Sequence, residues 1–311
     1  MASDKSRIGP VLTQEDGLKV RETYLRIDPR VDIYVKEKWS PNGDARLPVV
    51  LLHGAGMDGA GWDVPVEGTS LIDALARHGS RTFALDFRGH GRSSRVVDGT
   101  SVTVANAVED TLAVLDLVRE ITGQAKAILV GESFGTVVAP YVAEHVPERI
   151  AGLALLGLVY RLGDEPIDQS FDAMLDALRQ EPAGYAFTTE EEWPELFIPS
   201  ASPAVTAWHQ AHFGTAYAYP VGPYLGVGAR AAKPNLSLIG GRVLVITGDR
   251  DPYAKLPNTE AFLAGVGTTH TRHVHQRGVG HLPYVEKDLK AVQAEIGRLI
   301  DDATEDERGD R

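Results

Sequence analysis

Short apolar runs alternate with helix-like segments along most of this chain, and this alternation constrains the fold more than any other feature. Strand-like runs occupy residues 48–53, 81–87, 127–130, 150–159, 243–247 and 270–275. Helical spacing marks residues 104–122, 134–145, 259–265 and 289–300. Strands separated by helices pair in parallel, with helices on both faces of the sheet. We therefore predict an α/β fold, and expect residues 19–38, which lack an intervening helix, to form an antiparallel pair at the sheet edge.

Two segments depart from this rhythm. Residues 161–232 contain ten acidic and three basic residues, are rich in Pro and Gly, and include helical pieces without a clear strand. An insertion of this length between two strands is typical of a lid, so we predict a mainly helical cap at 161–232 and a core made of 1–160 and 233–300. Residues 301–311 hold six acids and two Arg, and we expect a disordered acidic tail.

Composition excludes several classes of protein. The chain of 311 residues contains no Cys, which excludes a disulfide scaffold, a Cys-ligated metal site and a Cys nucleophile. Its net charge of −12 disfavours nucleic acid as a partner. No stretch approaches the roughly 18 apolar residues of a membrane span, and the first residues lack the apolar core of a secretion signal. We expect a cytoplasmic protein without membrane contact.

The sequence GESFG at residues 131–135 carries the strongest chemical signal. It follows a strand and opens a helix, so Ser133 would stand on a sharp turn where flanking glycines avoid clashes. A serine hydroxyl needs a base and a group that orients the base. His281 and Asp251 each follow a later strand, in the chain order Ser, Asp, His. Asp249 is a second candidate for the acid and Asp164 a third.

Four motifs in order resemble the α/β-hydrolase superfamily over roughly residues 20–300: LLHGAG at 51–56, DFRGHGRS at 86–93, the GESFG turn, and the segments around Asp251 and His281. The resemblance implies an α/β-hydrolase fold with a cap. It also implies a catalytic triad of Ser133, Asp251 and His281, and an oxyanion hole formed by the backbone N–H groups of Ala55 and Phe134. His53 and His90 would shape loops. Neither a cofactor nor a metal is expected.

Aromatic residues gather in the predicted cap. Nine of the 22 aromatic residues lie between positions 185 and 224. They would form either the lid's own core or the wall of a pocket for a bulky apolar substrate. The expected pocket residues are Met57, Trp62, Trp193, Trp208, Phe213 and Tyr217.

These features predict a serine hydrolase that cleaves a carboxylic ester or lactone of a bulky, largely apolar small molecule through an acyl-enzyme. The same triad also serves thioesterases, acyltransferases, C–C hydrolases and lyases, and a non-catalytic receptor could retain the pocket. Glu132, next to the serine, is expected to be structural. The oligomeric state stays open.

Overall fold

A mixed sheet of ten strands forms the centre of the computed structural model, which describes residues 6–43, 46–160, 169–188, 197–228 and 233–309. The strand order is β1-β3-β4-β6-β5-β7-β8-β11-β12, and β2 pairs with β3. The strands are β1 (Ser6–Ile8), β2 (Leu12–Thr13), β3 (Lys19–Asp28), β4 (Val31–Trp39), β5 (Val49–Leu52), β6 (Thr82–Leu85), β7 (Ala127–Glu132), β8 (Ile150–Leu156), β11 (Arg242–Gly248) and β12 (Thr271–Gln276). From β6 to β12 every pairing is parallel, whereas β1 to β4 are antiparallel. The predicted antiparallel pair within 19–38 is confirmed as β3 and β4.

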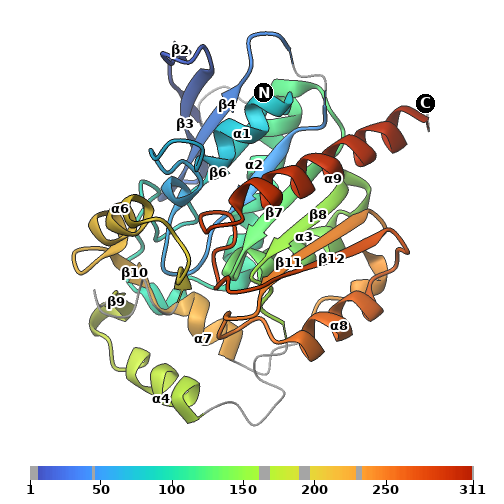
Figure 1. Ribbon diagram of the computed structural model, residues 1–311. Helices are drawn as coiled ribbons and strands as arrows, with labels where there is room; N and C mark the ends of the chain where they lie inside the picture. The colour runs from blue at the N-terminus through green and yellow to red at the C-terminus, as the bar shows by residue number, and fades with distance from the viewer. Residues whose placement is uncertain (1–5, 44–45, 161–168, 189–196, 229–232, 310–311) are drawn as a thin grey trace.

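Helices cover both faces of this sheet (Figure 1). They are α1 (Leu71–His78), α2 (Val104–Thr122), α3 (Phe134–His145), α8 (Leu256–Gly265) and α9 (Leu289–Gly309). Successive residues of a strand point to opposite faces: Val50 and Leu129 pack with α2 and α3, while Leu51 and Val130 pack with α1 and α9. Both faces are apolar because both are buried, which explains why these strands read as continuous apolar runs. The structure confirms the α/β class.

A separate group of elements lies between β8 and β11 in the chain and gathers beside one end of the sheet (Figure 1). It comprises α4 (Gln169–Leu178), β9 (Tyr185–Phe187), α6 (Pro203–Phe213), β10 (Ala218–Pro220) and α7 (Gly222–Gly228). β9 and β10 pair as a two-stranded antiparallel sheet, which corrects the expectation that this segment has no strand. Each strand has only three residues, too few for a period-2 pattern to emerge.

The predicted disordered tail at 301–311 is wrong for the described residues, because α9 continues to Gly309. Ala303 and Thr304 are buried, and the Thr304 hydroxyl accepts a hydrogen bond from the backbone of Leu47 at 3.2 Å. Acidic side chains on the same turns form ion pairs with basic side chains of the core, such as Asp306 with Arg242 at 2.7 Å. The burial of a few small residues at helical spacing orders a segment whose composition indicated disorder, and the ion pairs add little to it.

None of the helices in the described part of the chain has the length and apolar character needed to cross a membrane.

Candidate active site

The GESFG turn joins β7 to α3 in a geometry that requires its glycines. A Cβ atom at Gly131 would overlap the backbone of Gly135, and a Cβ atom at Gly135 would overlap the carbonyl oxygen of Leu52 on β5. Strand and helix approach each other so closely that no side chain fits on either side of the turn. The predicted strand–turn–helix context is therefore present.

Ser133 itself adopts φ 48° and ψ −111°, a backbone conformation that residues other than glycine rarely adopt. Ser133 occupies the position before the first turn of α3, where a serine side chain commonly caps the helix, but here it makes no capping hydrogen bond. Its carbonyl oxygen accepts hydrogen bonds from the Thr136 backbone and hydroxyl at 2.8 and 2.6 Å. Strained non-glycine backbone held by its surroundings is found at functional sites.

His281 and Asp251 are brought together as predicted. Nδ1 of His281 lies 2.8 Å from Oδ2 of Asp251, and both side chains are buried. The other carboxylate oxygen of Asp251 accepts backbone hydrogen bonds from Tyr253 and Ala254 at 2.8 and 3.0 Å. With its Nδ1 proton donated to Asp251, the imidazole presents Nε2 as the basic nitrogen.

The pKa of His281 reflects opposing effects. Burial lowers it, but the charge and hydrogen bond of Asp251 and the charges of Glu132 and Glu286 raise it above its usual value. The imidazolium form is therefore stabilised in this site, which is the form that a general base must reach during catalysis.

Asp249 does not compete for the role of the acid. Its Oδ1 accepts a hydrogen bond from the backbone of Gly278 at 2.5 Å and so stabilises the loop before His281. Asp164, the third candidate, lies outside the described residues.

The loop after β5 runs directly beside Ser133. A Cβ atom at Gly54 would lie 3.1 Å from Cβ of Ser133, so the backbone that carries Ala55 approaches the turn that carries Phe134. His53 donates from Nδ1 to the Gly54 carbonyl at 2.7 Å and accepts from the Phe87 backbone at 3.1 Å. Burial lowers the pKa of His53 to about 3, so this ring is neutral and serves as a loop-shaping group.

The second loop histidine supports the same backbone. Nε2 of His90 lies 2.9 Å from the carbonyl oxygen of Ala55, to which it donates. Asp86 accepts backbone hydrogen bonds from Gly59 and Arg92, both at 2.7 Å, and so connects this loop to the DFRGHGRS segment. The expectation that these motif residues shape loops is confirmed by their contacts.

Three residues that support the site carry no sequence signal that could have identified them. Gly157, just after β8, has φ 60°, and a Cβ atom there would lie 2.9 Å from Nδ1 of His281, so the imidazole packs on this glycine. Glu286 accepts hydrogen bonds from the Gly280 backbone at 2.7 Å and from the Ser200 hydroxyl at 2.7 Å. The third is Glu132, whose buried carboxylate faces His281.

The expected pocket residues divide into buried and partly buried sets. Met57, Trp62 and Phe213 are buried in one apolar cluster with Tyr284, and the Trp62 and Tyr284 rings lie 4.5 Å apart. Trp208 and Tyr217 are partly buried against that cluster. Trp193 lies outside the described residues.

The cap is attached to the core at the loops that carry the site. His212 on α6 stacks on Trp208 with ring centroids 4.8 Å apart, and its Nε2 lies 3.8 Å from Oδ1 of Asp58 in the loop after β5. The backbone N–H of His281 donates to the carbonyl oxygen of Phe197 at 2.8 Å. Phe197 and His212, which both belong to the segment between β8 and β11 that we call the cap, thus contact the loops of His281 and Ala55.

Tyr219 packs against a small cluster formed by Leu175, Leu178 and Val221. Tyr224 contacts the same cluster, and its hydroxyl also approaches the loop of Ala55, since a Cβ atom at Gly56 would lie 3.0 Å from it. The cap aromatics therefore serve two purposes: some form a core within the cap, and others pack onto the loops near the site.

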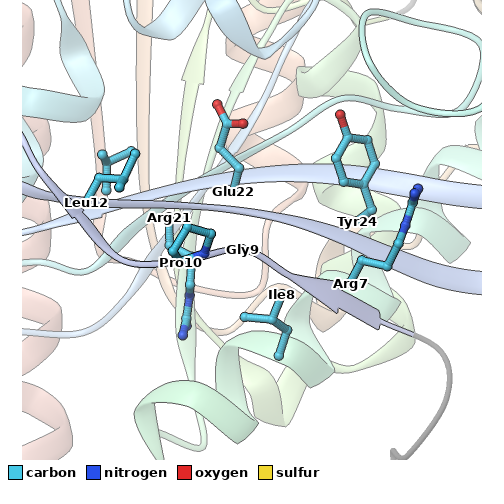
Figure 2. A pocket seen from close by; sticks show the side chains of 9 residues that line it. Arg7, Ile8, Gly9, Pro10, Leu12, Arg21, Glu22 and Tyr24 are labelled. Atoms are coloured by element: carbon cyan, nitrogen blue, oxygen red, sulfur yellow. The ribbon is translucent and has the colours of Figure 1, made fainter.

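Two further features bear on ligands. Within the described ranges no group of three or more His, Asp or Glu side chains is arranged to hold a metal ion. A surface pocket of about 350 Å³ lies on the N-terminal strands, beside β1 and β3, and contains none of the site residues (Figure 2). Its lining residues are Arg7, Ile8, Gly9, Pro10, Leu12, Val20, Arg21, Glu22 and Tyr24.

Comparison with known proteins is consistent with this geometry. A family model described as "alpha/beta hydrolase fold" matches residues 48–192. Proline iminopeptidase from Neisseria gonorrhoeae is 29% identical over 178 residues, which are 57% of this chain and 50% of that protein. A non-heme chloroperoxidase from Kitasatospora aureofaciens is 32% identical over 174 residues, 55% of this chain and 52% of that protein. The chain thus spans about half the length of these curated relatives.

Solved structures match over nearly the whole chain. A hydrolase from Pseudomonas aeruginosa superposes with a TM-score of 0.66 at 22% identity, covering 96% of this chain and 99% of that one. An esterase from Exiguobacterium antarcticum gives 0.67 at 17% identity, covering 94% and 99%. Identities this low show the fold alone. Together with the family model over residues 48–192, these matches show that the chain has the α/β-hydrolase fold.

Proposed function

We propose that this chain is a serine hydrolase that cleaves a carboxylic ester or lactone of a bulky, largely apolar small molecule through an acyl-enzyme. The observation that carries the proposal is the pairing of two features at one end of the sheet. Ser133 is held at φ 48° without capping its helix, and a buried His281 is oriented by Asp251 at 2.8 Å on the adjacent strand ends. A buried imidazole oriented by a carboxylate is the base that such a serine hydroxyl requires.

In the acylation half of the reaction, Ser133 Oγ attacks the ester carbonyl carbon while its proton passes to Nε2 of His281. The carbonyl oxygen becomes an oxyanion that the N–H groups of Ala55 and Phe134 stabilise, helped by the N-terminal end of α3. The intermediate collapses, the imidazolium protonates the leaving alcohol, and the acyl group remains on Ser133.

In the deacylation half, His281 takes a proton from water as the water oxygen attacks the acyl carbon. Collapse of the second tetrahedral intermediate breaks the bond to Ser133 Oγ, which regains a proton from the imidazolium. The products are a carboxylic acid and regenerated enzyme. Asp251 orients the imidazole and stabilises its charge in both halves, without itself being protonated.

The substrate class rests on the cap. Trp208 and Tyr217 are partly buried beside Met57, Trp62 and Phe213, and this apolar cluster borders the loop of Ala55. An apolar wall there favours a bulky apolar acyl or alcohol group and excludes water from the oxyanion.

A fluorophosphonate probe tests the chemistry directly. We expect covalent labelling of the wild-type protein, with the adduct mapped to Ser133 by mass spectrometry. Ser133→Ala should remain folded, resist labelling and lower kcat for an ester by about 10⁴- to 10⁶-fold. An active protein that is labelled at another residue, or at none, would contradict the assignment. Product analysis with an added alcohol would distinguish hydrolysis from acyl transfer.

A further inference from the structure

A second carboxylate faces the catalytic imidazole from the side opposite Asp251. Glu132 is the last residue of β7, is 1% exposed, and its Oε1 lies 3.6 Å from Nε2 of His281. Among the described residues, neither the other oxygen of this carboxylate nor Nε2 itself has a hydrogen-bond partner. The carboxylate also fills the space against Gly54, where a Cβ atom would come within 2.5 Å of Oε2.

A purely structural role does not account for this arrangement. Ile128, Leu129 and Val130 of the same strand are buried and apolar, and an apolar side chain would satisfy the packing at position 132. A buried carboxylate that keeps one oxygen without a hydrogen bond, and whose other bonding is limited to the Gly54 backbone, is costly unless a positive charge lies close by. The imidazolium of His281 provides that charge, and it exists only when Nε2 carries a proton.

We propose that Glu132 is a positioning residue for the catalytic base: its carboxylate stabilises protonated His281 from the Nε2 side and thereby sets the pH above which Nε2 can accept the proton of Ser133. The inference rests on the proposed function for its catalytic consequence. The electrostatic interaction between Glu132 and His281 exists in the free protein and does not depend on a substrate.

The titratable groups around Glu132 and His281 support a coupling between these two side chains. Asp251 lies on the Nδ1 side of the imidazole, Glu286 holds the loop before it, and the Tyr284 phenol lies near Glu132. Burial raises the pKa of Glu132 to about 7, with the Asp251 charge adding to the increase and His281 opposing it. The charge of Glu132 in turn raises the pKa of His281. Two groups coupled in this way share one proton near neutrality.

The catalytic consequence has a definite sign. When the pair loses its shared proton on the alkaline side, Glu132 is ionised and His281 is neutral, which is the state that can accept the serine proton. During attack the imidazolium re-forms beside an ionised carboxylate, which stabilises the transition state. Removing the charge should therefore move the acid limb of kcat/KM to lower pH while reducing its plateau.

The test is an NMR titration of His281 in protein labelled with ¹⁵N-histidine, with His281→Gln identifying the resonance. We expect the pKa of His281 to fall by about one pH unit in Glu132→Gln. The matched control is Glu120→Gln, which removes the same charge from the exposed surface of α2 and should leave the titration unchanged. The acid limb of kcat/KM should move with the NMR value, and its plateau should fall about tenfold. An unchanged His281 titration in folded Glu132→Gln would overturn the proposal.

A second measurement keeps the test decisive if Glu132→Gln does not fold. Infrared titration of the wild-type protein should show a carboxyl band that disappears near pH 7, in step with the His281 resonance. A protein in which no carboxyl group titrates above pH 6 would equally overturn the proposal. A wrong serine hydrolase assignment would give a different result. Fluorophosphonate would then fail to label Ser133, while Glu132 and His281 would still titrate together.

Discussion

At the scale of single residues, the nucleophile turn leaves almost no choice of side chain at its glycines. Gly135→Ala would place a methyl group against the carbonyl oxygen of Leu52, and should lower the free energy of unfolding by about 3 kcal/mol. Gly240→Ala is the control, because a Cβ atom at Gly240 meets nothing within 4 Å. Chemical denaturation measures both. Equal stabilities would contradict the close approach of α3 to β5.

The ionisation of His281 predicts how activity depends on pH. Because its pKa is raised above the usual value of about 6.5, the inactive imidazolium persists to higher pH than in a free histidine. We expect kcat/KM for a neutral ester to be lost as pH falls through this raised pKa and to rise to a plateau above it. Initial rates from pH 5 to 9 provide the measurement. A profile that is flat over this range would exclude a histidine base.

At the residue scale, the sequence predicted the pairing of His281 with Asp251 and missed the carboxylates that lie around it. Ser133, Asp251 and His281 stand in motifs whose order along the chain is itself informative, and the structure joins His281 to Asp251. Glu132 was expected to be structural and Glu286 was not identified. Their roles depend on contacts with backbone groups and rings that are distant in the sequence, and the local sequence does not predict those contacts.

At the scale of elements, the last turns of α9 pack against the core and stabilise it. A chain ending at Ile300 would lose buried Ala303 and Thr304, together with the ion pairs of Arg242 with Asp306 and of Lys126 with Glu307. We expect this truncation to lower the free energy of unfolding by about 2 kcal/mol, mainly through lost burial, since exposed ion pairs contribute little. A chain ending at Gly309 is the control and should match the full chain. If the two truncated chains unfold at the same temperature, the last turns of α9 do not stabilise the protein, and the expectation of a disordered tail would hold.

Where capping residues mark a helix, the sequence predicted its first and last residues correctly. The helix expected at 104–122 is observed as Val104–Thr122, begun by a reciprocal cap between Thr103 and Asn106 and ended by Gly123 at φ 69°. The three-residue strands of the cap were not predictable, because their pairing depends on the tertiary contact between Tyr185–Phe187 and Ala218–Pro220. Acidic composition likewise gave the wrong expectation for the end of α9, since the basic partner of Asp306, Arg242, lies 64 residues away in the sequence.

The cap helix α6 gives a test of substrate selection. Phe213 is fully buried, so its truncation would create a cavity and confuse stability with selectivity. Trp208 is only partly buried, and Trp208→Ala should change the discrimination between bulky and acetyl esters by about 1–3 kcal/mol in kcat/KM. Phe187→Ala is the control, because that ring is exposed on β9. If both variants scale all esters equally, Trp208 belongs to the packing of the cap and does not contact substrate.

At the scale of the whole molecule, parallel strands bring the site together. Ser133 follows β7, Asp251 follows β11 and His281 follows β12, so all three residues lie at the carboxyl ends of parallel strands, the edge where open α/β sheets bind ligands. This convergence could be predicted from the alternation of strands and helices. The residues that attach the cap to this edge could not, because contacts such as His212 with Asp58 and Phe197 with His281 join segments far apart in the sequence.

The net charge of the whole chain acts on charged substrates as they approach the protein. A net charge of −12, with ten acidic residues between 161 and 232, produces a negative potential that repels anions and leaves neutral molecules unaffected. We expect neutral aromatic or aliphatic esters to exceed carboxylate-bearing esters of equal size in kcat/KM. Added salt screens charges beyond about 10 Å at 0.1 M, so raising NaCl from 0.02 to 0.5 M should increase kcat/KM for the anionic ester about threefold and leave the neutral ester nearly constant. Equal salt responses would show that the acidic surface does not influence substrate choice.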